Sequence, residues 1–284
     1  MKIRNALEII GSTAAKHGEE VDSREKVIIL SEVINRSFSQ IISDKEQELS
    51  EAQTIKLKSV LQELFERSKP LEKITGRAFF YGLELFVDEN VLSPRPETEI
   101  LVEKVLEYID KKKLSEPKVL DLGTGSGCIS IAIVNRCPGA RITAVDVSEA
   151  ALDVAIRNVG AYSMTDRIDV IRSDLFEKIK DHDYDIIVSN PPYISEDELK
   201  DLDPRVLWHD PRCALYGGKD GLDFYRRIFD TAYLYLKRGG AVFVEAGANQ
   251  ADKIKGLIDE RYIDVEVFPD HGYNERVIFV RTQH

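Results

Sequence analysis

A regular alternation of short apolar segments with helical patterns, running from Lys118 onward, constrains the fold more than any other feature of this chain. Strands that alternate with helices predict an α/β fold, with a parallel sheet and helices on both of its faces. Near-continuous apolar segments such as Ile186-Ile187-Val188 fit strands buried on both sides. The predicted strands are 119–122, 141–145, 168–172, 185–189, 241–245, one near 265, and 276–280; the predicted helices are 129–136, 148–159, 222–236 and one starting near 250.

The first quarter of the chain has a different character. Apolar residues recur there at spacings of three and four, and no proline precedes Pro70, so residues 1–75 are predicted to form an all-helical domain. Residues 78–93 are expected to form two short strands, and a helix is expected to begin near Pro96. A chain of 284 residues is long enough for about two domains. The expected organisation is therefore a helical domain (1–75), a β-hairpin linker (76–95) and an α/β domain (96–284).

Composition excludes several classes of protein. The chain has 39 Lys and Arg against 50 Asp and Glu, so its net charge of −11 is opposite to the charge that dominates non-specific binding of nucleic acid. Its apolar segments are too short to span a membrane, and its N-terminus lacks the pattern of a signal peptide. Cys128, Cys137 and Cys213 form no CxxC pair, and the five histidines are scattered. We expect a cytoplasmic monomer that binds no metal, no membrane and no nucleic acid directly.

The first candidate site is the segment Asp121-Leu122-Gly123-Thr124-Gly125-Ser126-Gly127, between a predicted strand and a predicted helix. Glycines let a backbone turn sharply and approach a ligand, and the helix start offers free N–H groups. The third glycine comes one residue too early for a dinucleotide fingerprint, and a purely structural turn is the alternative. Asp146 ends the next strand, where an acid can bind the two hydroxyls of a ribose or simply cap the following helix. Together they indicate an adenosine-containing ligand.

The second candidate site is Asn190-Pro191-Pro192-Tyr193, which directly follows a predicted strand and so shares the ligand-binding edge of the sheet. The side-chain oxygen of Asn190 and the carbonyl oxygen of Pro191 can each accept a hydrogen bond from a planar NH₂ group. The prolines hold these acceptors rigidly, and Tyr193 offers an aromatic face to a flat substrate and a nearby cation. This arrangement is typical of a site that aims an amide or base nitrogen at an electrophilic methyl group.

These two segments and Asp146 resemble the amino-group methyltransferases that use S-adenosyl-L-methionine. The segment Ser93-Pro94-Arg95-Pro96-Glu97-Thr98-Glu99 narrows the resemblance to the HemK/PrmC family, the protein-(glutamine-N5) methyltransferases of peptide chain release factors. The resemblance covers essentially the whole chain, loosely over 1–70 and more closely from about residue 74. Its supporting matches are Ile74-Thr75-Gly76, Phe79, Tyr81-Gly82, Gly217-Gly218, Asp220-Gly221-Leu222 and Asn274-Glu275-Arg276-Val277.

The resemblance implies a seven-stranded, mostly parallel, Rossmann-like class I methyltransferase sheet and a role for each motif residue. Asp146 would bind the cofactor's ribose, Asp174 and Leu175 would flank its adenine, and Asn190 would contact both cofactor and substrate. Glu245, near the end of a predicted strand, is interpreted as structural. The methionine part of the cofactor would contact Gly123, Thr124, Gly125, Ser126 and Gly127; the substrate amide would contact Asn190, Pro191, Pro192 and Tyr193; and a loop closing over the cofactor, or simply a helix start, would comprise Arg95, Pro96, Glu97 and Thr98.

The function implied by the resemblance is methyl transfer to the side-chain amide nitrogen of the glutamine in the GGQ motif of peptide chain release factors. The helical domain would then recognise the release factor. Three alternatives stay open at this point: an amino-group methyltransferase of adenine or guanine in nucleic acid, a methyltransferase of a ribosomal-protein glutamine, and a binding module or NAD-dependent enzyme that uses the glycine loop.

Overall fold

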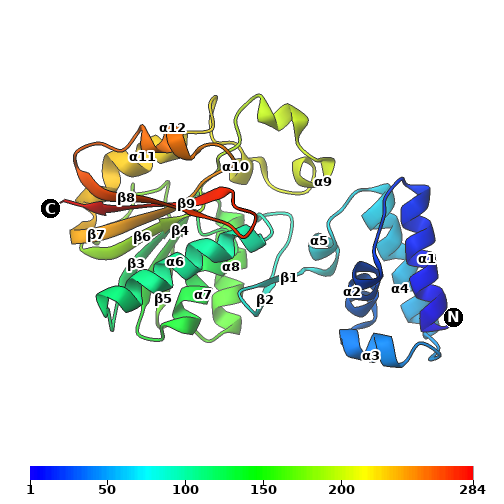
Figure 1. Ribbon diagram of the computed structural model, residues 1–284. Helices are drawn as coiled ribbons and strands as arrows, with labels where there is room; N and C mark the ends of the chain where they lie inside the picture. The colour runs from blue at the N-terminus through cyan, green and yellow to red at the C-terminus, as the bar shows by residue number, and fades with distance from the viewer. Residues whose placement is uncertain (284) are drawn as a thin grey trace. The chain divides into compact units, whose positions relative to one another are not determined.

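The computed structural model describes residues 1–283 and divides the chain into two compact units, Met1–Gly76 and the residues from Arg77 on (Figure 1). The first unit is entirely helical. Three of its helices begin with a capping box, in which the side chains of the N-cap residue and of the third helical residue each bind a backbone N–H of the other. Its elements are α1 (Ile3–Lys16), α2 (Ser23–Ile34), α3 (Phe38–Ser43), α4 (Glu51–Leu61), a π-helical turn (Gln62–Glu66) and α5 (Leu71–Thr75).

The helical unit has its own apolar core. Ile3 and Ile10 of α1, Leu30 of α2, Ile41 of α3 and Leu57 of α4 are fully buried and belong to one cluster. The apolar residues that recur at helical spacing in the sequence are therefore the residues that join these helices.

The second unit is built on a seven-stranded sheet in the order β5-β4-β3-β6-β7-β9-β8. Neighbouring strands from β5 to β7 are parallel, and β9 is antiparallel to both β7 and β8, so the predicted seven-stranded, mostly parallel sheet is confirmed. The strands are β3 (Lys118–Leu122), β4 (Arg141–Asp146), β5 (Ile168–Arg172), β6 (Tyr184–Ser189), β7 (Leu236–Glu245), β8 (Tyr262–Pro269) and β9 (Glu275–Thr282).

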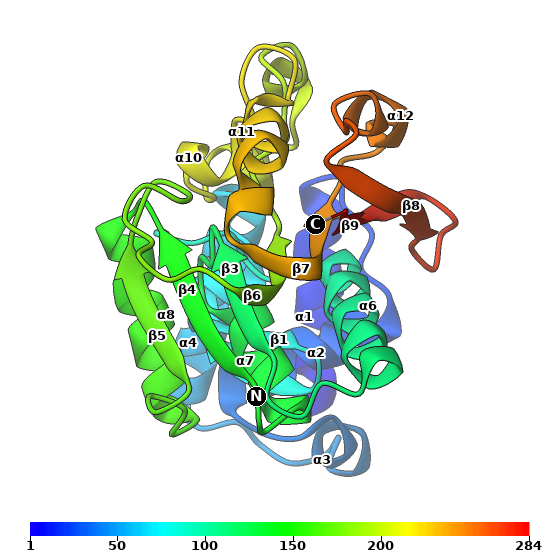
Figure 2. The same cartoon turned by 90° about the vertical axis from the view of Figure 1, so that its left-hand side faces the viewer.

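Helices cover both faces of this sheet, as Figure 2 shows. Successive strand residues point to opposite faces. Val119 and Ile186 accordingly pack in the cluster that contains α6 and α7, whereas Leu120 and Ile187 pack in the cluster that contains α11 and α12. The helices are α6 (Pro96–Lys112), α7 (Cys128–Arg136), α8 (Glu149–Ala161), α11 (Asp223–Thr231) and α12 (Ala251–Lys255).

The hairpin lies within the second unit. Strands β1 (Arg77–Phe80) and β2 (Leu83–Phe86) pair antiparallel, and Phe80 and Leu85 are buried in the same cluster as α6 and α7. The side chain of Asn158 in α8 fastens the hairpin further, because it bonds both the N–H and the carbonyl of Phe86. Residues 76–95, expected to form a linker, thus contribute a packed hairpin followed by an irregular segment that leads into α6.

Two segments differ from the sequence-based prediction. The helix predicted over 222–236 is wrong at its C-terminal end: α11 stops at Thr231, a 3₁₀ turn spans Ala232–Leu234, and β7 begins at Leu236. This strand starts early because it continues through Gly239, which has a φ of 72°, to pair again with β6 after a register shift. The sequence predicts no helix or strand over residues 194–217, but the structure has a 3₁₀ turn (Glu198–Asp201), α9 (Pro204–Leu207) and α10 (Arg212–Leu215) there.

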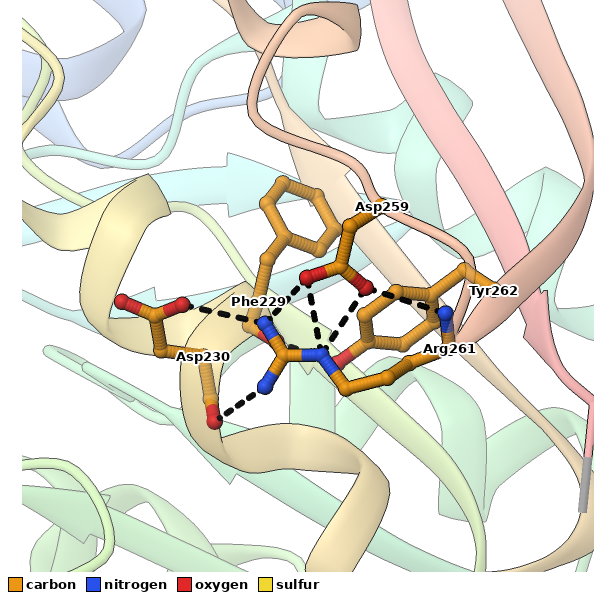
Figure 3. A network of polar contacts seen from close by, with 5 residues as sticks. All are labelled: Phe229, Asp230, Asp259, Arg261 and Tyr262. Atoms are coloured by element: carbon orange, nitrogen blue, oxygen red, sulfur yellow. Dashed lines mark hydrogen bonds and ion pairs between the residues drawn. The ribbon is translucent and has the colours of Figure 1, made fainter.

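A polar network ties the end of α11 to the start of β8 (Figure 3). The Arg261 guanidinium bonds the Asp259 carboxylate, with Nε 2.8 Å from Oδ1, and reaches the backbone carbonyl and the carboxylate of Asp230 at 3.0 and 3.1 Å. Beside it the buried Tyr262 hydroxyl donates to the Phe229 carbonyl at 2.7 Å. These bonds hold the edge strand against the helix that covers the sheet.

We predict that Tyr262→Phe lowers the free energy of unfolding by about 1 kcal/mol, because it removes a buried hydrogen bond and leaves the ring in place. Tyr273→Phe is the matched control: its side chain is exposed, and the change should stay within about 0.5 kcal/mol. Urea denaturation of the two variants measures both values. Equal stability of the two would show that the Tyr262 hydroxyl contributes nothing.

Candidate functional site

The site lies at the carboxyl ends of the parallel strands. In the sheet, Leu122 of β3 pairs with Val145 of β4 on one side and with Ser189 of β6 on the other. The segments that follow these three residues therefore emerge next to one another. They are the glycine-rich segment after Leu122, Asp146 at the end of β4, and Asn190 after β6, so the two candidate sites of the sequence adjoin at one edge.

The glycine-rich segment is a tight turn held by backbone bonds. Gly123, Gly125 and Gly127 all have positive φ, between 54° and 80°, a conformation that residues with a Cβ rarely adopt. The N–H groups of Gly123 and Thr124 both donate to the Val145 carbonyl, at 2.8 and 2.9 Å. Space beside Gly123 and Gly125 is open, since a Cβ added at either would meet no atom within 4 Å. The turn thus presents bare backbone to the edge of the sheet.

A buried carboxyl supports this turn from below. One oxygen of Asp121 accepts bonds from the hydroxyls of Thr124 and Ser130, at 2.7 and 2.6 Å, and the other has no partner among the residues that the structure describes. Burial raises the pKa of Asp121 to about 6 despite these two bonds. Asp121 therefore joins the turn to α7, which begins immediately after it.

Asp146 both organises the turn and faces the cavity beside it. Its Oδ2 accepts from Gly125 N at 3.0 Å and its Oδ1 from Ser148 N at 2.9 Å, while the Ser148 hydroxyl caps α8. Each carboxylate oxygen has further acceptor capacity beyond these bonds. Burial raises the pKa of this carboxyl above its usual value, against the lowering by its backbone hydrogen bonds.

A first cavity, of about 930 Å³ including its mouth, opens beside the turn; we call it the glycine-loop cavity. Ser93 and Ser126 line it, and their buried hydroxyls have no hydrogen-bond partner among residues 1–283. Such unpartnered polar atoms fit a polar ligand that would complete them. The predicted residues that line this cavity are Arg95, Thr98, Gly123, Thr124, Gly125, Ser126, Asp146, Asp174, Leu175, Asn190 and Pro192.

Asp174 and Leu175 occupy one wall of this cavity. The Asp174 carboxylate forms an ion pair with Arg227 of α11, with 2.7 Å between Oδ1 and Nη2. Leu175 is buried and has a φ of 48°, which a hydrogen bond from the Ser173 hydroxyl to the Leu175 carbonyl helps to hold. The apolar side chain of Leu175 is therefore kept in a definite place beside the polar end of Asp174.

Hydrogen bonds and close packing with residues distant in the sequence hold the Asn190–Tyr193 segment in place. The Asn190 Nδ2 group donates to the Thr98 hydroxyl at 3.1 Å, and Gln250 donates to the Tyr193 carbonyl at 2.8 Å. Gly217 contacts the segment so closely that an added Cβ would lie 2.6 Å from the Pro192 carbonyl oxygen. A Cβ at Gly221 would likewise lie 2.4 Å from the Tyr193 carbonyl oxygen. Gly217 and Gly221, both noted in the sequence, therefore pack directly against the backbone of Pro192 and Tyr193.

A second cavity, of about 1080 Å³ including its mouth, lies on the other side of this segment; we call it the tyrosine cavity. Pro191 and Tyr193 line only this cavity, whereas Arg95 and Asn190 line both. Burial raises the pKa of Tyr193 to about 12, so its hydroxyl stays protonated near neutral pH. Asn190 therefore stands where the two cavities meet.

Arg95 connects two segments at this junction. Its guanidinium forms an ion pair with the buried carboxylate of Asp210, at 2.9 Å, which ties the segment before α6 to the one between α9 and α10. Pro96 and Glu97 are exposed at the start of α6 and line neither cavity. Gly127 also lines neither cavity. It packs against α8, since a Cβ added at Gly127 would lie 3.5 Å from the Cβ atom of Ala155.

Sequence reasoning assigned no role here to Gln250 or Asp210, and it interpreted Glu245 as structural. Glu245 ends β7 and is fully buried beside Asn190 and Thr98. The only sequence signal for it was an acid at the end of the predicted strand 241–245. Within residues 1–283, no group of three or more His, Cys, Asp or Glu side chains could hold a metal ion. Over that same part of the chain, no helix has the length and apolarity needed to cross a bilayer.

Comparison of the sequence with known proteins shows which proteins this chain is similar to. Residues 96–208 match the family model of the methyltransferase small domain. The release factor glutamine methyltransferase of Chlorobaculum tepidum is 35% identical over 292 residues, which cover 99% of either chain. That of Clostridium acetobutylicum is 36% identical over 283 residues, covering 98% of either chain. The crystal structure of the release factor-specific protein-(glutamine-N5) methyltransferase of Alicyclobacillus acidocaldarius is 33% identical, covers 67% of this chain and 94% of that chain, and has a TM-score of 0.42.

We predict that Gly217→Ala lowers the free energy of unfolding by about 1–3 kcal/mol, because the new methyl group would overlap the backbone of Pro192 and Tyr193. Gly160→Ala is the control, since an added Cβ in α8 meets no atom within 4 Å and alanine favours a helix. Thermal or urea denaturation compares them. A Gly217→Ala variant as stable as Gly160→Ala would contradict the close approach described here.

Proposed function

The chain belongs to the family of release factor glutamine methyltransferases, and from that premise we propose that it transfers a methyl group from S-adenosyl-L-methionine to the side-chain amide nitrogen of the GGQ glutamine in a peptide chain release factor. The observation that carries the proposal is the position of Asn190, which lines both the glycine-loop cavity and the tyrosine cavity. A methyl donor in the first and a glutamine side chain in the second would meet at this residue.

The residues of the glycine-loop cavity fit the donor. Asp146 would accept hydrogen bonds from the ribose hydroxyls, and the bare backbone at Gly123 and Gly125 leaves room for the methionine part. Leu175 would pack on the adenine, and Asp174 would bind its exocyclic amine from its place beside Arg227. The unpartnered hydroxyls of Ser93 and Ser126 would complete the polar contacts. When bound, S-adenosylmethionine supplies an electrophilic methyl group carried on a sulfonium.

The residues of the tyrosine cavity fit a primary amide. The nitrogen of an amide is a weak nucleophile because its lone pair is delocalised, so orientation matters more than activation. The Asn190 side-chain oxygen and the Pro191 carbonyl would each accept one N–H of the glutamine, and Tyr193 would pack against the flat group. Catalysis would consist mainly of holding this nitrogen in line with the methyl group.

A nucleic-acid substrate is the second candidate. The Asn190–Tyr193 segment could also hold the amino group of adenine or guanine, and only the charge and the whole-chain relatives distinguish the substrates. A net charge of −11 opposes binding of a polyanion, and the curated relatives that match nearly the whole chain are named for release factors. We therefore favour the protein substrate and assign to Met1–Gly76 the recognition of the release factor body, in the cytoplasm where translation ends.

Incubation with S-adenosylmethionine and either purified release factor, ribosomal proteins, total RNA or DNA tests the proposal. We expect a mass increase of one methyl group on the GGQ glutamine in tryptic peptides, and no comparable incorporation into the other substrates. Methylation confined to nucleic acid or to a ribosomal protein would overturn the proposed substrate.

We predict that Asn190→Ala lowers kcat for release factor at least a thousandfold while the Kd of S-adenosylmethionine changes less than about threefold. The side-chain oxygen is the acceptor that would orient the substrate nitrogen, whereas most donor contacts lie elsewhere in the glycine-loop cavity. Single-turnover methylation and isothermal calorimetry measure the two effects. Equal losses in transfer and cofactor binding would contradict the role of Asn190.

We predict that Asp146→Ala, unlike Asn190→Ala, weakens cofactor binding and raises the Kd of S-adenosylmethionine at least tenfold. The variant removes the expected ribose acceptor and also the bond that holds Gly125 N. Calorimetry gives the affinity, with Glu149→Ala, an exposed acid in the first turn of α8, as the control that should bind normally. Normal binding by Asp146→Ala would place the ribose elsewhere.

A further inference from the structure

The proposed mechanism gives no role to the buried carboxyl group of Glu245. Glu245 is the last residue of β7 and is 2% exposed, and its Oε2 atom has no hydrogen-bond partner in the described part of the chain. An unpaired buried carboxyl is costly, so a position that retains one usually has a role that depends on it. The hydroxyl of Thr98 and the amide of Asn190 lie beside this carboxyl group, and both lower its pKa.

The sheet register brings these residues together. Val188 of β6 pairs with Phe243 of β7. Two residues further along the chain lie Asn190, which directly follows β6, and Glu245, which ends β7. Because side chains alternate with a period of two, Asn190 and Glu245 project from the same face as Val188 and Phe243. That face is covered by α6, whose first turn supplies Thr98.

The hydrogen-bonding capacities of Glu245 and Thr98 determine which way the side-chain amide of Asn190 is turned. An ionised carboxylate only accepts hydrogen bonds, and a Thr98 hydroxyl that donates to it has only lone pairs left for Asn190. The NH₂ end of the Asn190 amide must therefore face both Glu245 and Thr98. The 3.1 Å hydrogen bond from Asn190 Nδ2 to Thr98 Oγ1 agrees with this orientation. The carbonyl end must then point away from the cluster.

We propose that Glu245 is a positioning residue for methyl transfer: its ionised carboxylate, together with Thr98, holds the NH₂ group of Asn190 inward, so that the Asn190 carbonyl oxygen faces the substrate amide. The proposal rests on the proposed function, in which that oxygen accepts an N–H of the glutamine. A reversed Asn190 would present its own NH₂ group to the substrate's NH₂ group, and two donors do not bind each other.

The charge state of Glu245 makes this arrangement dependent on pH. Burial raises the pKa of Glu245 to about 7, and the charge of Glu97 at the start of α6 raises it further. The neighbouring Thr98 hydroxyl, the Arg276 charge and the Asn190 amide all lower it. Tyr193 and Tyr225 also face this carboxyl, and burial raises the pKa of both hydroxyls, so they stay neutral. Above pH 7 the ionised form accepts from Asn190. Below it, a protonated Glu245 can donate instead, and the constraint on Asn190 is lost.

Steady-state kinetics with full-length Glu245→Gln between pH 6 and 9 test the proposal. We expect kcat for release factor to fall at least tenfold at pH 8, with the Kd of S-adenosylmethionine within twofold of wild type. The wild-type profile should rise with pH around an apparent pKa near 7, and this acid limb should vanish in the variant. Asp185→Asn is the matched control: it removes a mostly buried carboxylate at the opposite end of β6 and should keep the limb.

A matched pair at Thr98 separates positioning from packing. Thr98→Ser keeps the hydroxyl, and its kcat should stay within about threefold of wild type. The isosteric Thr98→Val removes the hydroxyl, and its kcat should fall as far as that of Glu245→Gln. Wild-type kcat and an intact acid limb in Glu245→Gln, or equal activities of the two Thr98 variants, would overturn the proposal.

An NMR titration tests the proposal without any activity. In protein labelled with ¹⁵N-asparagine, the Asn190 side-chain signals, assigned with Asn190→Ala, should shift with a midpoint near pH 7 in wild type and should not shift in Glu245→Gln. If wild type fails to methylate release factor but this titration is seen, the proposed function fails and the positioning role stands. If wild type methylates release factor and the signals do not titrate, the positioning role fails alone.

Discussion

The parallel pairing of β3 with β4 and of β6 with β3 and β7 is the constraint on which the rest of the site depends. It brings the ends of four strands to one edge, so that residues from distant parts of the sequence become neighbours. Each strand end contributes a different chemical group: bare backbone after β3, a carboxylate at the end of β4, an amide after β6 and a buried acid at the end of β7. A shift of one residue in any of these pairings would turn the contributing side chain to the other face.

Rigidity at this edge comes from close packing rather than from the strands alone. Gly217 and Gly221 lie so near the Pro192–Tyr193 backbone that no side chain fits between them, and Gln250 bonds the Tyr193 carbonyl. Asp121 holds the glycine-rich turn against α7 in a similar way. A site whose catalysis consists of orientation requires such support, because small displacements of the acceptors would misalign the reacting nitrogen.

The sequence predicted the features that are written locally and missed those that depend on distant contacts. Alternating strands and helices, the glycine turn, Asp146 and Asn190 each follow from a short pattern at a strand end, and the structure brings them together. Other contacts join residues that are far apart in the chain, and no local pattern reveals them. They are the contacts of Gln250 and Gly217 with the Pro192–Tyr193 backbone, the ion pair of Arg95 with Asp210, and the proximity of Glu245 to Asn190. The end of α11 was mispredicted for a similar reason, since pairing with β6 overrides the helical pattern there.

A crystal structure of the protein with S-adenosylhomocysteine and a peptide containing the Gly-Gly-Gln sequence tests the central claim most directly. The account predicts the nucleoside beside Asp146 and the glutamine amide within hydrogen-bond distance of both the Asn190 side-chain oxygen and the Pro191 carbonyl oxygen, with its nitrogen facing the sulfur. A glutamine bound outside the tyrosine cavity, or an Asn190 side chain whose NH₂ group faces the peptide, would contradict it.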